Sequence, residues 1–105
     1  MTSAAARTPW RLSIAKDYDD MSRLAADFIE ADARAKPDLL LCLSAGGSPT
    51  GAYQRLAQRH ARVPKLFRRM RAMQIDEWGG LPRGNPATCR VDLQKKLLSL
   101  SLIHI

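Results

Sequence analysis

Apolar residues recur along the chain at two different spacings. From Met21 to Ile29 they return every three or four positions while charged residues occupy the other face, which predicts an amphipathic helix that ends before Pro37. Residues 39–43 are all apolar, as is typical of a short parallel strand that is covered on both faces. Cys42 belongs to this run, so we expect it to be a buried free thiol.

Two other segments have patterns that are typical of strands. Trp10, Leu12 and Ile14 alternate with polar residues, which predicts a short strand before the first helix. A further strand is predicted over residues 70–75, with its apolar side chains on one face. Strands and helices therefore alternate, and this order predicts an α/β protein with an open, mostly parallel sheet and flanking helices.

Capping residues mark the predicted helix starts. Asp17 and Asp20 lie where carboxylates meet the positive end of the first helix dipole. Ser48 can cap the next helix, with Pro49 at its first helical position, where a missing N–H does no harm. Asn85 is the predicted cap of the last helix.

Length and composition limit the class of protein. The 105 residues fit one small domain or part of a larger one, and 46% hydrophobic with 26% charged residues excludes a disordered or collagen-like chain. Residues 1–9 are small and polar, so we expect a flexible N-terminus and a domain that begins at residue 10. No apolar run suits a membrane helix or a signal peptide, which predicts a cytoplasmic protein with no membrane partner.

The net charge of +7 is concentrated in the second half of the chain. From Arg55 to Arg71 there are seven basic residues and no acidic one, which could attract a sugar phosphate or a nucleic acid. Phe67 is the only aromatic residue in this block, so a base-stacking platform is poorly supported and a nucleic-acid-binding module is disfavoured. Arg55, Arg59 and Arg62 share a helical face that we expect to be solvated.

A glycine-containing loop follows the first apolar run. Gly46 and Gly47 allow the backbone to approach a ligand closely, so that N–H groups and the next helix dipole, together with Ser48, could hold a phosphate. The loop matches neither the Walker pattern nor Gly-x-Gly-x-x-Gly. From this pattern alone, phosphate binding and a plain tight turn both remain open.

An acidic pair, Asp76 and Glu77, follows the strand predicted over residues 70–75. Asp76 would face the same edge of the sheet as the glycine loop, where a carboxylate could act as a general base, although a solvated loop charge is the simpler alternative. Glu77 would point to the opposite side and have a supporting or structural role. Cys42 and Cys89 match no metal-ligand spacing, so no metal site is predicted.

Three sequence blocks resemble a known family in the same order. The blocks are LLCLSAGGSPTGAY at residues 40–53, QIDEWGGLP at 74–82 and NPATCR at 85–90. They resemble the superfamily of glucosamine-6-phosphate deaminase, galactosamine-6-phosphate isomerase and 6-phosphogluconolactonase. The resemblance covers about residues 10–98 and corresponds to the N-terminal portion of a family domain more than twice this length.

The resemblance implies a fold and a reaction. The fold would be a Rossmann-like α/β domain of the sugar-phosphate isomerase type, present in part over residues 10–105. Gly46, Gly47 and Ser48 would bind the phosphate of a phosphorylated sugar, and Asp76 would take the proton from the carbon next to the open-chain carbonyl. Glucosamine or galactosamine 6-phosphate would become a ketose 6-phosphate and ammonia, with no metal or organic cofactor.

The chain also departs from the family pattern. Trp78 stands where deaminases usually have Tyr and lactonases usually have Arg, which favours the galactosamine-6-phosphate isomerase-like branch over the alternative, hydrolysis of a sugar-phosphate lactone. The family's later Asp, His and Glu cluster and its phosphate-binding lysine lie beyond Ile105. We therefore expect a fragment with negligible turnover on its own, and a homo-oligomeric full-length form stays open.

Overall fold

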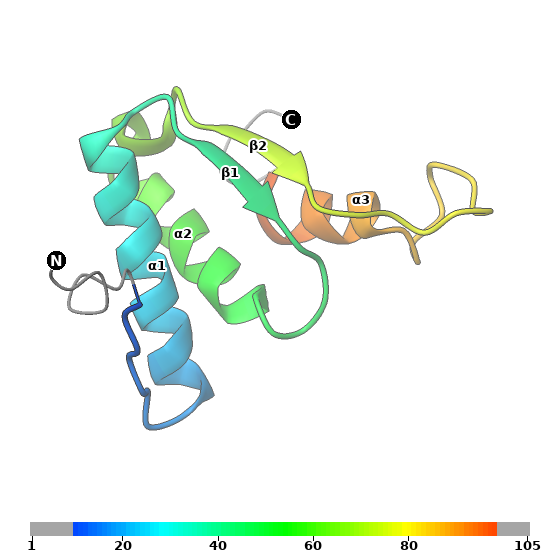
Figure 1. Ribbon diagram of the computed structural model, residues 1–105. Helices are drawn as coiled ribbons and strands as arrows, with labels where there is room; N and C mark the ends of the chain where they lie inside the picture. The colour runs from blue at the N-terminus through cyan, green and yellow to red at the C-terminus, as the bar shows by residue number, and fades with distance from the viewer. Residues whose placement is uncertain (1–9, 99–105) are drawn as a thin grey trace, which may run out of the picture.

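The computed structural model describes residues 10–98 (Figure 1). The predicted flexible segment, residues 1–9, lies outside the described residues. No helix within the described range is long and apolar enough to cross a membrane. The elements, in chain order, are the helices and strands α1 (Tyr18–Ala35), β1 (Leu40–Leu43), α2 (Thr50–Arg62), the 3-10 helix η2 (Pro64–Phe67), β2 (Arg71–Gln74), α3 (Cys89–Leu93) and the π-helix η3 (Gln94–Leu98).

Strands β1 and β2 form a parallel sheet, with Leu40 opposite Arg71 and Leu43 opposite Gln74. Helix α2 connects them, so β1, α2 and β2 make up one crossover unit of an α/β fold. The two strands end at the same edge of the sheet (Figure 1). The loops that follow them therefore start side by side, and the predicted α/β class is confirmed.

One face of the sheet is covered and the other is open within the described part of the chain. Leu43 and Ala72 are buried on the covered face, and Figure 1 shows α1 and α2 on the same side of the strands. Leu40 and Met73 are about half exposed on the other face. The prediction that β1 is covered on both faces, and with it that of a buried Cys42, is therefore wrong: the Cys42 thiol is exposed, because successive side chains of a strand point to opposite faces.

The strand predicted at Trp10, Leu12 and Ile14 does not form. These three side chains are 83 to 86% exposed, and the segment has no neighbouring strand among residues 10–98. Alternation of apolar and polar residues was the only basis for this prediction. A strand also needs a partner for its backbone hydrogen bonds, which the local pattern cannot supply.

The first two helices begin differently. Asp17 caps α1 as predicted, and its Oδ1 accepts a hydrogen bond from the Asp20 N–H at 2.8 Å. Helix α2 begins only at Thr50, with Pro49 in the capping position, so the predicted cap by Ser48 is wrong. The Tyr18 hydroxyl on α1 instead accepts from the Gly51 N–H at 2.9 Å, which places the start of α2 against α1.

The last helix is shorter and less regular than predicted. Thr88, and not Asn85, caps α3, because the Thr88 hydroxyl accepts from the Val91 N–H at 3.2 Å. The Asn85 Oδ1 accepts from the Ala87 N–H at 2.8 Å and closes a turn ahead of the helix. After Leu93 the helix widens into the π-helix η3, a change that apolar spacing does not reveal.

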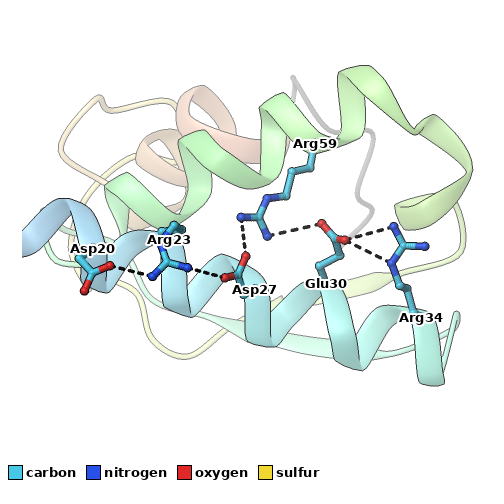
Figure 2. A network of polar contacts seen from close by, with 6 residues as sticks. All are labelled: Asp20, Arg23, Asp27, Glu30, Arg34 and Arg59. Atoms are coloured by element: carbon cyan, nitrogen blue, oxygen red, sulfur yellow. Dashed lines mark hydrogen bonds and ion pairs between the residues drawn. The ribbon is translucent and has the colours of Figure 1, made fainter. Parts of the chain in front are cut away.

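Ion pairs connect α1 with α2 (Figure 2). Arg59 on α2 has a side chain only 15% exposed and pairs with Asp27 at 2.7 Å and Glu30 at 3.4 Å. Arg55 likewise pairs with Asp19 at 2.6 Å. The prediction of a solvated arginine face is therefore wrong for two of its three members, since only Arg62 has no acidic partner within the described range.

We predict that Arg59→Met destabilises the chain by about 1 to 2 kcal/mol, because two α1 carboxylates lose their partly buried partner. Urea unfolding followed by circular dichroism measures the change. Arg62→Met, at an exposed position one turn further along α2, is the matched control and should change stability by less than about 0.5 kcal/mol. Equal effects of the two substitutions would contradict the assigned role of Arg59.

Candidate functional site

The loop between β1 and α2 has a backbone that requires glycine at one position. Gly46 has a φ of +103°, a conformation that residues with a side chain rarely adopt. No atom lies within 4 Å of the place where a Cβ of Gly46 or Gly47 would stand. Glycine is therefore needed at Gly46 for its backbone angle, and the loop surface beside it is open.

Hydroxyl groups from α1 and α2 hold the carbonyl groups of this loop. The Tyr53 hydroxyl donates to the Ser44 carbonyl at 2.6 Å, Thr50 Oγ1 to the Gly46 carbonyl at 2.7 Å and the Tyr18 hydroxyl to the Gly47 carbonyl at 2.7 Å. Burial raises the pKa of Tyr53, against the opposing effect of its hydrogen bond to Ser44. Tyr53 therefore remains a donor at neutral pH.

The fixed carbonyls determine where the amides point. In a trans peptide the carbonyl of one residue and the N–H of the next point in opposite directions. Because the carbonyls of Gly46 and Gly47 face the helices, the N–H groups of Gly47 and Ser48 face away from them. Neither N–H finds an acceptor among the residues that the structure describes, so this pair of donors is available to an anion.

The third amide of the loop is already bonded. The Gly46 N–H donates to Asp92 Oδ2 at 3.2 Å, and the Lys96 ammonium donates to the Gly46 carbonyl at 3.1 Å. Lys96 and Asp92 also form an ion pair with 2.9 Å between Nζ and Oδ1. Burial acts to raise the pKa of Asp92, but the hydrogen bonds from Lys96 and Gly46 outweigh it, and the pKa is lowered.

Glu77 caps the last helix. Its carboxylate accepts from the N–H groups of Cys89 at 2.7 Å, Arg90 at 2.9 Å and Trp78 at 2.9 Å. Desolvation acts to raise the pKa of Glu77, but the Arg90, Trp78 and Cys89 N–H groups and the Gln74 amide together lower it to about 2. The geometry fits the structural role predicted for this residue.

Asp76 lies beside the start of α3 with its carboxylate exposed to solvent. The Cys89 thiol donates to Asp76 Oδ1 at a sulfur–oxygen distance of 3.9 Å. Desolvation and the carboxylates of Glu77 and Asp76 raise the pKa of Cys89, so the thiol stays protonated at neutral pH. No protein cation pairs with Asp76 among residues 10–98.

A hollow of about 230 Å³ lies between the two loops and α3. Gly46 is the only predicted site residue that lines the hollow. Asp76 does not line the hollow, but its carboxylate contacts Cys89, which does. Gly47 and Ser48 are exposed on the adjoining loop. The full lining consists of Ala45, Gly46, Trp78, Pro86, Ala87, Thr88, Cys89 and Asp92.

A larger groove of about 560 Å³ runs along α1. Apolar side chains of that helix, among them Met21 and Phe28, dominate its wall. It contains none of the predicted site residues. No group of three or more metal-ligating side chains gathers within the described range.

Sequence reasoning missed several residues that shape this site. The hydroxyl groups of Tyr18 and Tyr53 bond the loop, and the spacing of residues along the chain does not reveal these contacts. Asp92 on α3 and Lys96 on the adjoining η3 lie four residues apart, a helical spacing that predicts an ion pair. Their contact with a loop 46 and 50 residues away has no sequence signal.

Known proteins resemble the chain in sequence and in fold. It is 42% identical over 73 residues to glucosamine-6-phosphate deaminase of Arthrobacter sp. (strain FB24) and 34% identical over 89 residues to that of Geobacillus sp. (strain WCH70). These matches cover 70% and 85% of this chain but only 28% and 36% of the relatives. The chain thus spans about a third of the length of these curated relatives.

The fold resembles a solved structure of a monomeric glucosamine-6-phosphate deaminase, described as a missing link of the NagB superfamily. The TM-score is 0.82 and the sequence identity 23%, over 91% of this chain and 42% of that protein. No protein-family model matches the chain.

The crossover unit, with a glycine loop and an acidic pair at one edge of a parallel sheet, defines an α/β protein whose candidate site lies at the strand ends. The sequence and fold matches show which proteins of this class the chain is similar to. Over the residues matched, the chain resembles a part of glucosamine-6-phosphate deaminase in sequence.

Acid should weaken the α3 cap in a defined range. Because the pKa of Glu77 is lowered from 4.5 to about 2, its contribution to stability is fully present above about pH 4.5 and is lost as the pH falls through about 2. An NMR titration should therefore show the Cys89 and Arg90 amide signals moving with a midpoint near 2.

Glu77→Gln should abolish this titration, whereas Asp32→Asn, an exposed substitution on α1, should leave it intact. A midpoint above 4 for the two amides would contradict the capping geometry.

Proposed function

We propose that the loop after β1 binds the phosphate group of an amino-sugar phosphate. The observation that carries this is the outward pair of N–H groups at Gly47 and Ser48, which no described residue occupies. Two adjacent amides beside a helix N-terminus suit a phosphate dianion, and the exposed Ser48 hydroxyl adds a donor. The positive φ of Gly46 sets the direction of the loop.

We further propose that Asp76 is the general base of the reaction. Its carboxylate follows the neighbouring strand end and is not neutralised by a described cation. It would take the proton from the carbon next to the carbonyl of the open-chain amino sugar, leaving an enolamine. Protonation at carbon 1 would give an imine at carbon 2, and addition of water there with loss of ammonia would give the ketose 6-phosphate.

Ring opening requires acid–base groups that we do not assign within residues 10–98. The relatives are more than twice as long as this chain, and we propose that those groups belong to their remaining part. Binding and catalysis can accordingly be tested separately, the first in this chain and the second in a complete domain.

Phosphate recognition is testable in the chain itself. Glucosamine 6-phosphate should shift the NMR amide signals of Gly47 and Ser48, and glucosamine should not. Gly46→Ala should weaken this binding about tenfold or more, because the φ of +103° is strained for alanine.

Gly84→Ala is the matched control, since Gly84 has neither a positive φ nor a neighbouring atom in the way of a Cβ. Equal binding of the sugar with and without its phosphate would contradict the proposal.

The role of Asp76 is testable in a chimera. Residues 10–98 would replace the corresponding segment of the Arthrobacter deaminase, to which the chain is 42% identical over 73 residues. Ammonia release from glucosamine 6-phosphate would then be measured. Asp76→Asn should lower the rate about 10²- to 10⁴-fold with little change in KM, as expected for loss of a general base.

Asp38→Asn controls for the loss of one negative charge, because Asp38 precedes β1 and lies away from the carboxyl ends of the strands. A chimera with unchanged turnover after Asp76→Asn would rule out the assigned role.

A further inference from the structure

Two charged residues from the last helix bond to the candidate phosphate loop. Asp92 and Lys96 are 46 and 50 residues from Gly46 in the sequence, yet Asp92 accepts from its N–H at 3.2 Å and Lys96 donates to its carbonyl at 3.1 Å. Their side chains are 31% and 25% exposed, so the pair is partly withdrawn from water. Asp92 also lines the hollow beside the loop.

We propose that Asp92 is an internal substitute for the anion, and that a bound phosphate replaces it at the Gly46 N–H and at the Lys96 ammonium. Lys96 would thereby become the cation that binds the ligand. This inference rests on the proposed phosphate-binding function of the loop.

Hydrogen-bond chemistry supports the exchange. A carboxylate oxygen and a phosphate oxygen both accept from backbone N–H groups and from ammonium groups. The Gly46 N–H bonds to the Asp92 carboxylate, whereas the next two amides have no acceptor among the described residues. An anion that engages the Gly46 N–H must therefore take the place of Asp92.

The negative charge of Asp92 affects how strongly the loop binds an anion. A phosphate dianion within a few ångströms of the Asp92 carboxylate is repelled by it, which lowers the affinity of the loop for anions. The second bond of Lys96, to the Gly46 carbonyl, does not depend on Asp92. Lys96 therefore stays on the loop when Asp92 leaves, and its ammonium meets the incoming anion.

The test titrates the full chain with inorganic phosphate at pH 7 and follows the amides of the loop by NMR. Asp92→Asn keeps an oxygen acceptor for the Gly46 N–H but removes the charge, and should tighten phosphate binding about tenfold. Lys96→Met should weaken it about tenfold, by the same reasoning. Asp38→Asn and Lys65→Met make equal changes in net charge outside the hollow, ahead of β1 and on η2, and should alter the affinity less than about twofold.

A second test of the exchange uses only the wild-type chain. At saturating phosphate, the signals of the Asp92 carboxyl carbon and the Gly46 amide should both shift, and a change confined to Gly47 and Ser48 would overturn the exchange. If the wild-type chain binds phosphate and the Asp92→Asn variant binds it equally or more weakly, this inference is overturned while the proposed function stands. An absence of any phosphate response in the loop of the wild-type chain would overturn both.

Discussion

The candidate site depends on the hydrogen bonds that hold the carbonyl groups of the β1–α2 loop against the helices. Tyr53, Thr50 and Tyr18 fix three of these carbonyls. Because the peptide unit is planar and trans, the same bonds direct the following amides outward. An anion site built in this way would take its precision from the packing of the hydroxyl groups behind it.

The packing of α1 on α2 is therefore part of the site. Tyr18 belongs to α1 and bonds both the loop and the start of α2, so the two helices must keep their relative position for the amides to keep theirs. Arg59 and its two carboxylates on α1 hold that position further along the helices (Figure 2). A cap by Glu77 does the same for α3, whose Asp92 contacts the loop.

Local patterns predicted some parts of this structure and could not predict others. The first helix with its Asp17 cap follows from apolar spacing, and the pairing of parallel strands from the order of elements. The predicted strand at Trp10 does not form, because alternation of apolar and polar residues gives no information about a neighbouring strand. The predicted Ser48 cap is wrong, because the Tyr18 hydroxyl on α1 bonds the start of α2. The glycine loop and Asp76 were identified as candidates from strand ends and from resemblance. The outward amides and the Asp92–Lys96 contact depend on tertiary distances that no short motif encodes.

The central proposal is that the amides of Gly47 and Ser48 bind a phosphate while Asp76 faces carbon 2 of the sugar, the carbon next to the carbonyl. A crystal structure of the Arthrobacter chimera with glucosamine 6-phosphate tests this most directly. We expect phosphate oxygens within about 3 Å of both amides, and an Asp76 carboxylate oxygen directed at the hydrogen on carbon 2. A phosphate bound away from the loop, or an Asp76 carboxylate on the other side of the sugar from that hydrogen, would contradict it.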